Sequence, residues 1–95
     1  MPWMYILECS DKSYYVGSTV DLDSRFIAHN QGTGAKYTAR RLPVKLVYAE
    51  EFQSIAEAFD REKQVQGWRR AKREALIRGE FEDLPVLSKK IFRKG

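Results

Sequence analysis

The sequence predicts a small α/β domain of the α+β kind, in which a three-stranded, mainly antiparallel sheet is flanked by helices in the order β-β-α-β-α-α. A length of 95 residues suits a single hydrophobic core. The composition, with 43% hydrophobic and 32% charged residues, is that of a folded globular chain. Short apolar runs alternate with segments that carry helix caps and helical spacing, and this alternation predicts the order of the elements.

The first two strands are predicted as a β-hairpin. Residues 3–9 are mostly apolar and aromatic, residues 11–13 are polar and suit a turn, and residues 14–16 are again aromatic and β-branched. We expect residues 17–19 to break the second strand. Gly17 would then be either an ordinary turn residue or a place where the backbone closely approaches a ligand.

The first helix is predicted over residues 22–30, because Asp21 is a favourable N-cap. The glycine-containing residues 30–34 end this helix, and residues 35–43 are expected to form a loop. Helical spacing predicts one buried face that holds three apolar side chains, Leu22, Phe26 and Ile27.

A third strand and two further helices complete the order. Residues 44–49 alternate in part, which indicates a strand. Ser54, with a glutamate three residues later, forms a capping box and predicts a helix that ends near residue 66. Another helix is expected over residues 69–77, with Gly79 after its end.

Residues 1–80 are expected to form the domain and residues 81–95 a basic tail that is irregular or partly ordered. No apolar run reaches the roughly 18–20 residues that span a bilayer, and the N-terminus does not resemble a signal peptide. A single cysteine excludes an intramolecular disulfide and, with a single histidine, a structural zinc site. These features predict a reduced, cytoplasmic protein.

The net charge of +4 is distributed unevenly. Residues 61–95 hold 11 of the 17 basic residues. A basic segment of this kind favours a polyanion, nucleic acid above all, as the partner. The densest part either follows a phosphate backbone or is simply a solvated helix face, and it consists of Trp68, Arg69, Arg70, Lys72 and Arg73.

Glu62 is the most informative single residue. On an ideal helix its side chain lies in the middle of an apolar stripe that is formed by Ile55, Ala58, Phe59 and Val65. A carboxylate in such a place is either paired with a basic side chain or part of a metal site.

Other polar side chains also suit chemistry on a phosphate. Arg25 and His29 lie four residues apart, so they share one helix face, either as a phosphate-binding pair or as a solvated pair. Phenols occur on both strands of the hairpin, at Tyr5, Tyr14 and Tyr15. A phenol can transfer a proton when its surroundings adjust its pKa, or it can simply pack on the sheet.

Taken together, these residues resemble the GIY-YIG nuclease domain over about residues 2–78. The tripeptides at residues 3–5 and 15–17 resemble its paired motifs, although only Tyr5 matches strictly in the first. Residues 34–38 resemble a loop of its small, single-domain bacterial branch. By their spacing, the family's arginine, its histidine or tyrosine, and its metal-binding glutamate correspond to Arg25, His29 and Glu62.

The resemblance implies a divalent-metal-dependent DNA endonuclease with a role in repair or recombination. It implies that Glu62 holds one weakly bound Mg²⁺ or Mn²⁺, that Arg25 binds the phosphate, and that His29 orients a tyrosine or contacts the phosphate. Either Tyr5 or Tyr15 would accept the proton of the attacking water. Contacts to nucleic acid are expected from Gly17, Lys36, Tyr37, Arg69, Arg70, Lys72 and Arg73.

Two other functions stay open at this point. Several relatives carry an asparagine on the helix after the glutamate, and this chain has none there. The domain would therefore also suit a nucleic-acid-binding module that cuts poorly, or a unit of a larger complex whose protein partner supplies targeting. In the latter case Ile91 and Phe92 would dock on the partner, unless the tail folds back on its own domain.

Overall fold

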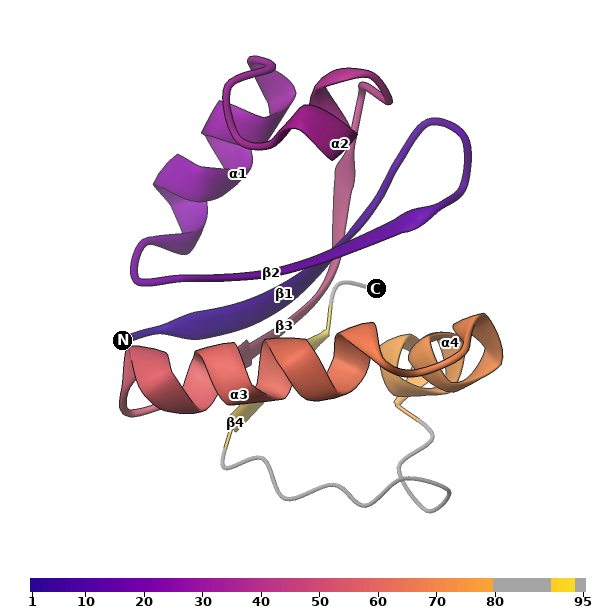
Figure 1. The fold of residues 1–95 in the computed structure, drawn as a ribbon. Helices are drawn as coiled ribbons and strands as arrows, with labels where there is room; N and C mark the ends of the chain where they lie inside the picture. Colours follow the sequence, from indigo (N-terminus) through magenta and orange to yellow (C-terminus); the bar gives the residue numbers. More distant parts are fainter. Residues whose placement is uncertain (80–89, 94–95) are drawn as a thin grey trace.

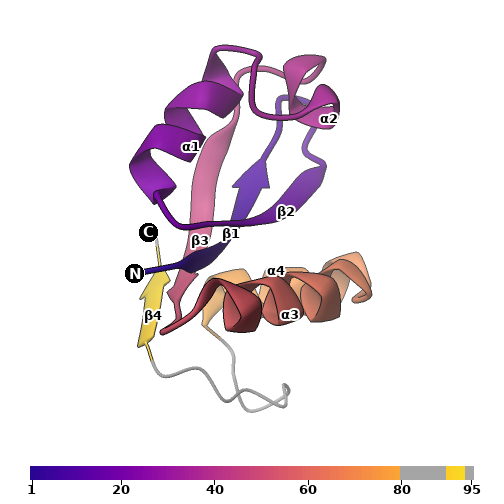
Figure 2. The same ribbon diagram turned by 60° about the vertical axis from the view of Figure 1, so that its left-hand side comes forward.

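A computed structural model describes residues 1–79 and 90–93. Four strands form one antiparallel sheet in the order β2-β1-β3-β4. Helices α1 and α2 cover one face of the sheet, and α3 and α4 cover the other (Figures 1 and 2). The predicted class and the order β-β-α-β-α-α are confirmed. In chain order the elements are β1 (Trp3–Glu8), β2 (Tyr14–Thr19), α1 (Leu22–Asn30), α2 (Lys36–Ala39), β3 (Lys45–Glu51), α3 (Ile55–Gln66), α4 (Arg70–Arg78) and β4 (Lys90–Arg93).

Two of these elements were not predicted. Helix α2 occupies part of the predicted loop, and its four residues are too few to show a helical period. Strand β4 lies in the predicted tail and pairs with β3, with Phe92 opposite Ala49. This pairing folds residues 90–93 back on the domain, while residues 80–89 and 94–95 of the predicted tail lie outside the described part of the chain.

The sheet separates two hydrophobic clusters. Toward α3 and α4, Met4 and Ile6 of β1 pack with Val65 and Leu76. Toward α1 and α2, Tyr5 and Leu7 of the same strand pack in a second cluster that also includes Cys9, Val44 and Ala49. A strand that is covered on both faces has a nearly continuous apolar sequence, and the first predicted strand has that pattern.

The predicted helix starts are confirmed. The carboxylate of Asp21 accepts the backbone N–H of Ser24 at 3.1 Å, and the hydroxyl of Ser54 accepts that of Glu57 at 3.2 Å. Gly79 ends α4 with φ 82°, the left-handed conformation that favours glycine. No helix in residues 1–79 is long and apolar enough to cross a membrane.

The predicted buried faces of α1 and α3 were partly wrong. Ile27 is 55% exposed, and the buried residue of α1 is His29. On α3, Ile55 and Phe59 are exposed. The buried stripe of α3 instead runs through Ala58, Arg61 and Val65, so the periodicity was right but its centre was displaced by a buried arginine.

The predicted break after the second strand was also wrong. Strand β2 continues to Thr19, and Gly17 lies inside it, opposite Tyr5 of β1. A glycine within a strand marks a place where another group approaches the backbone closely.

Candidate active site

Two of the predicted catalytic side chains, Tyr5 and Tyr15, lie against Gly17 on β2, which is an edge strand of the sheet. A Cβ at Gly17 would lie 2.5 Å from the hydroxyl oxygen of Tyr5 and 2.7 Å from its Cζ. Such contacts are too short for any side chain. The absence of a side chain at Gly17 therefore lets the phenol of Tyr5 lie against β2, where it can take part in a site.

A chain of hydrogen bonds holds Tyr5 from the α1–α2 side. The Tyr5 hydroxyl lies 2.8 Å from Nε2 of His29, and Nδ1 of His29 lies 2.8 Å from the hydroxyl of Thr38. Thr38 donates its own proton to the carbonyl of Ala35 at 3.2 Å. We therefore assign the imidazole proton to Nδ1, which leaves Nε2 to accept the proton of Tyr5.

Burial controls the protonation of this pair. Burial raises the pKa of Tyr5 to about 12, although the neighbouring Arg25 guanidinium opposes the rise. Burial, together with the positive charge of Arg25, lowers the pKa of His29 to about 4. At neutral pH the two side chains are thus a neutral phenol and a neutral imidazole.

Gly34, in the segment after α1, helps to position both Arg25 and His29. The carbonyl of Gly34 accepts a hydrogen bond from the Arg25 guanidinium at 2.8 Å. A Cβ at Gly34 would lie 2.6 Å from Nδ1 of His29. One glycine thus orients Arg25 and leaves room for the imidazole, and Arg25 interacts with the hydroxyls of both Tyr5 and Tyr15.

Glu62 reaches the same strand from the α3 side. Its Oε1 accepts the hydroxyl proton of Ser18 at 2.6 Å, and its Oε2 accepts the amide of Gln66 at 2.8 Å. Gln66 also donates to the carbonyl of Val16 at 3.1 Å, which fixes α3 along β2. The Glu62 side chain is 12% exposed and lies at the margin of the buried stripe, not in its middle as predicted.

Glu62 and Tyr5 contact neighbouring residues of β2, Ser18 and Gly17. The negative charge of Glu62 contributes to the raised pKa of Tyr5, although the two residues come from opposite sides of β2. We call Tyr5, Arg25, His29 and Glu62 the candidate centre. It combines a cation, a proton-transfer pair and a carboxylate at the edge of a sheet, which is a suitable set for chemistry on a phosphodiester.

Glu62 is the candidate metal ligand. No group of three or more His, Cys, Asp or Glu that could hold a metal occurs within the described part of the chain. One carboxylate beside the hydroxyl of Ser18 is nevertheless an oxygen donor set of the kind Mg²⁺ uses when water and substrate phosphate complete its shell. These residues fit a weakly held Mg²⁺ or Mn²⁺.

The predicted alternative, in which Glu62 is paired with a basic side chain, has little support: the ion pair that Glu62 makes is long and lies at the surface. Lys63 lies 3.8 Å from Glu62 and is itself 55% exposed on its side chain. The buried pair of α3 lies one residue earlier, where Nε of Arg61 is 3.2 Å from Oε1 of Glu50. The buried Arg61–Glu50 ion pair was not predicted.

The residues predicted to contact nucleic acid differ in their exposure. Lys36, Tyr37, Arg69 and Arg70 are exposed, Lys72 and Arg73 are half-buried, and Gly17 is buried. Two of the arginines also bond within the protein: Arg70 donates to the carbonyl of Lys12 at 2.7 Å, and Arg73 donates to that of Gln66 at 2.8 Å. The ammonium of Lys72 lies over the ring of Trp68, 4.5 Å from its centre.

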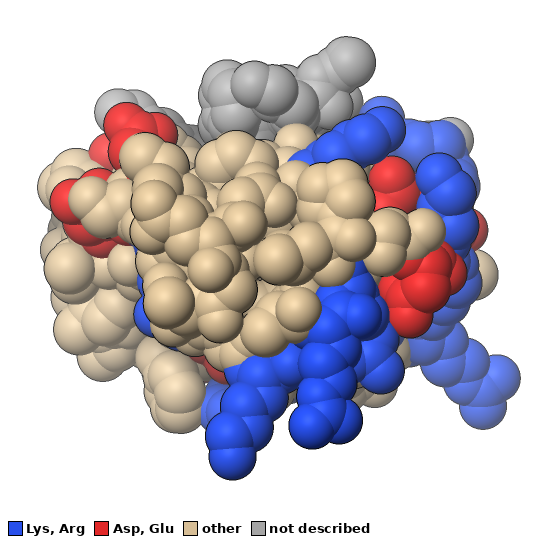
Figure 3. Space-filling model, turned by 90° about the horizontal axis from the view of Figure 1, so that it is seen from above, with Lys and Arg blue, Asp and Glu red and all other residues tan. Residues whose placement is uncertain are grey.

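Basic side chains are not spread evenly over the α1–α2 side of the molecule. Figure 3 shows this side, with Lys and Arg gathered along one margin and one end and a few acidic side chains among them. Such an uneven distribution of positive charge favours the approach of a polyanion from a limited range of directions.

Four residues of the site were missed by sequence reasoning: Ser18, Gly34, Thr38 and Gln66. Gln66 carried a usable signal, because it lies four residues after Glu62 and so shares its helix face. Gly34 and Thr38 lie in residues 34–38, which resemble a family loop, but no role was predicted for either. Ser18 carried no signal, since its partner Glu62 is distant in the sequence.

Known proteins resemble this chain over most of its length. The model of the GIY-YIG catalytic domain matches residues 1–75. A UPF0213 protein of Streptococcus pneumoniae is 46% identical over 86 residues, which cover 90% of this chain and 86% of that protein. A UPF0213 protein of Halobacterium salinarum is 47% identical over 77 residues, which cover 81% of this chain and 100% of that protein.

A solved structure agrees with these matches. The solution NMR structure of the UPF0213 protein BH0048 from Bacillus halodurans has 45% sequence identity and a TM-score of 0.53. The similarity covers 81% of this chain and 83% of that one. The chain belongs to the GIY-YIG catalytic domain family.

Proposed function

We propose that this protein is a divalent-metal-dependent endonuclease that hydrolyses phosphodiester bonds in DNA. The family to which it belongs is one of nucleases, and nucleases of this family generally depend on a divalent metal. The observation that carries the proposal is the Tyr5–His29 pair against Gly17, with the Glu62 carboxylate bound to Ser18, the next residue of the same strand.

Arg25 is proposed to bind the scissile phosphate. Its guanidinium is already oriented by Gly34 and lies beside the hydroxyls of Tyr5 and Tyr15. A fixed guanidinium can pair with two non-bridging oxygens at once and stabilises the charge that develops on them during attack.

Tyr5 and His29 are proposed to remove the proton of the attacking water. With a pKa near 12, Tyr5 is protonated at neutral pH and must pass on its own proton as it accepts another. Nε2 of His29, 2.8 Å away, is placed to take it. A bound phosphate would offset the charge of Arg25, which is one of the causes that lower the pKa of His29.

Tyr15 is the alternative proton acceptor. Its ring centre lies 5.1 Å from that of His29 and 6.4 Å from that of Tyr5. The hydrogen bond to His29 belongs to Tyr5, and this favours Tyr5 in the transfer.

Glu62 is proposed to hold the Mg²⁺ or Mn²⁺, with Ser18 and Gln66 orienting its two carboxylate oxygens. When bound, such an ion polarises the phosphate and stabilises the leaving oxygen. A single protein carboxylate implies low affinity for the ion in the absence of substrate.

The proposed substrate would associate the protein with the nucleoid in the cytoplasm and with repair or recombination. The exposed basic residues, including Lys36 and Arg69, are proposed to contact the DNA backbone.

Nicking of supercoiled and branched DNA with Mg²⁺ or Mn²⁺ tests the proposal. Wild type should cut, EDTA should abolish cutting, and Glu62→Ala and Tyr5→Phe should each reduce it by at least about tenfold. Asp60→Ala is the matched control, because Asp60 is an exposed acidic residue of the same helix.

Each other outcome has a definite meaning. Binding of DNA without cleavage by any variant would replace the proposal with a binding module. Cleavage that is equal in wild type and Glu62→Ala would contradict the assigned centre.

A further inference from the structure

A pocket of about 210 Å³ lies along the outer edge of β2, next to the candidate centre. Its volume is more than ten times the roughly 10–15 Å³ that a single water requires, so it can take a larger group. The lining is mostly aromatic and consists of Tyr14, Tyr15, Val16, Tyr37, Gln66 and Arg73. None of the proposed steps of hydrolysis uses Tyr14, Tyr37 or Arg73.

Tyr15 connects the pocket with the candidate centre. One neighbour of its ring is His29, with the ring centres 5.1 Å apart. Another neighbour is Tyr37, at 6.1 Å and with an angle of 30° between the ring planes. A group in the pocket would therefore be separated from the Tyr5–His29 pair only by the side chain of Tyr15.

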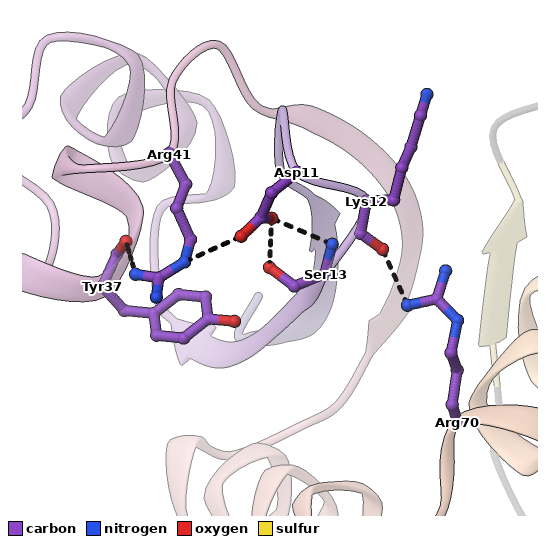
Figure 4. A network of polar contacts seen from close by, with 6 residues as sticks. All are labelled: Asp11, Lys12, Ser13, Tyr37, Arg41 and Arg70. Atoms are coloured by element: carbon purple, nitrogen blue, oxygen red, sulfur yellow. Dashed lines mark hydrogen bonds and ion pairs between the residues drawn. The ribbon is translucent and has the colours of Figure 1, made fainter.

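Two arginines contact the rings that line the pocket. Arg41 lies over the ring of Tyr37, 3.8 Å from its centre, and Arg70 lies over the ring of Tyr14 at 4.4 Å. Figure 4 shows how both arginines are tied to the hairpin turn: Arg41 donates to Asp11 at 3.1 Å, and Arg70 donates to the Lys12 carbonyl at 2.7 Å. Walls that are fixed before binding reduce the entropic cost of binding a flat ligand.

The polar side of the pocket is formed by Gln66 and Arg73. Arg73 brings a positive charge to it, and its guanidinium is fixed by the carbonyls of Val65 and Gln66. Gln66 brings an amide whose nitrogen already donates to Glu62 and Val16, so the amide oxygen is available as an acceptor. A flat ligand with polar edges and an attached negative charge matches such a lining.

We propose that this pocket binds one nucleobase, from a nucleotide next to the phosphate that is cut. The inference rests on the proposed function, which places a phosphate at Arg25. Bases stack on aromatic side chains without strong regard to sequence, and arginine adds a cation–π contribution. A base within a duplex has both faces covered, so the substrate must offer an unpaired or flipped nucleotide at the point of cleavage.

Binding of defined oligonucleotides to the Glu62→Gln protein tests this inference without any cleavage. The probes are a short single-stranded oligothymidylate, the same strand with all of its bases removed, and a blunt duplex. Tyr37→Ala should weaken binding of the oligothymidylate by about 5- to 150-fold, the range expected for loss of one stacked base. The base-free strand should bind equally well with and without that substitution.

Two further variants separate stacking from folding. Tyr37→Phe keeps the ring and should keep the affinity. Phe59→Ala also removes an exposed ring, but one that lies on α3 outside the pocket, and it should not change binding. Thermal unfolding of each variant shows whether the fold is retained.

The inference is overturned if Tyr37→Ala weakens binding of the base-free strand as much as that of the oligothymidylate, or weakens neither. Such a result would leave the proposed nuclease activity untouched, because that activity is judged by cleavage. Conversely, intact discrimination between the two strands in a protein that does not cut would retain the base pocket and reject the nuclease.

Discussion

The charge of His29 depends on folding. Its side chain has no exposed surface, and both ring nitrogens are hydrogen-bonded. The neutral form is favoured in the folded protein because burial and Arg25 both act against the imidazolium. The unfolded chain imposes no such restriction, so folding and protonation of His29 are linked.

Acidification should therefore destabilise the protein through His29. Its pKa is about 4 when folded and about 6.5 when unfolded, so the unfolded state binds more protons between these values. Stability is full above pH 6.5 and falls toward pH 4, by up to about 3 kcal/mol at about 1.4 kcal/mol per pH unit. Urea unfolding at a series of pH values measures this fall.

His29→Gln provides the comparison, because its amide does not titrate. The raised pKa of the buried Glu50 contributes with the opposite sign but is present in both proteins, so it cancels in the difference. Equal slopes for wild type and His29→Gln between pH 4 and 6.5 would show that His29 is not held neutral by the fold.

Gly17 should tolerate no side chain. Gly17→Ala places a methyl group 2.5 Å from the Tyr5 hydroxyl, which should cost about 1–3 kcal/mol of stability and displace Tyr5 from His29. Gly67→Ala is the control: φ there is −80°, and the nearest atom would be 3.5 Å away. Chemical denaturation measures both, and equal effects at the two positions would refute the role of Gly17.

The elements are connected by a few polar side chains. Asn30, the last residue of α1, pairs with the backbone of Val44, the residue before β3. Its Oδ1 accepts the Val44 N–H at 2.9 Å, and its Nδ2 donates to the Val44 carbonyl at 3.2 Å. This asparagine therefore connects α1 with the strand that follows Val44.

Loss of this pairing should loosen α1 from the sheet. Asn30→Ala leaves two backbone groups of Val44 without their partners, at a cost of about 1–3 kcal/mol. Gln31→Ala changes a neighbouring exposed side chain and should cost far less. Urea midpoints compare the two, and an Asn30→Ala midpoint as high as that of Gln31→Ala would argue against the connection.

Among the helices and strands, those that depend on contacts between residues close in sequence were predicted correctly. The caps at Asp21 and Ser54 and the hairpin depend on residues close in sequence, and the structure confirms them. Helix α2 is too short for a period, and β4 depends on a distant strand. The buried face of α3 was displaced because Arg61, a residue type expected outside, is buried against Glu50.

The candidate site follows the same division. Its charged and phenolic residues were identified by type and spacing, whereas Thr38 and Ser18 were not, because only the tertiary fold brings them to His29 and Glu62. Which of the predicted DNA contacts also bond within the protein depends on tertiary structure, since Arg70 and Arg73 donate to backbone carbonyls of other segments.

For the whole molecule, the two edges of the sheet differ. The edge at β2 carries the candidate centre, and the outer edge of β3 is paired with β4. An unpaired strand edge invites association with another chain. Strand β4 covers the edge of β3 and becomes the new edge, but it has only four residues with a basic residue at each end, and such a short, charged edge discourages association on the side away from the chemistry.

Removal of residues 81–95 should test this division. The shortened chain keeps every residue of the candidate centre but uncovers β3, so it should self-associate in analytical ultracentrifugation while it still cuts DNA. The full-length chain is the control. A shortened chain that stays as monodisperse as the full-length one would show that β4 does not protect this edge.

The most direct test of a shared reaction centre is the single-turnover rate of DNA cleavage in wild type, Tyr5→Phe, Glu62→Gln and the double variant. Residues that act as a unit are not additive, so each single substitution should lower the rate about 10²-fold or more and the double should be little worse. Losses that multiply would mean that Tyr5 and Glu62 act independently. Cleavage at the wild-type rate by either single variant would contradict the assignment of a nuclease centre at Gly17.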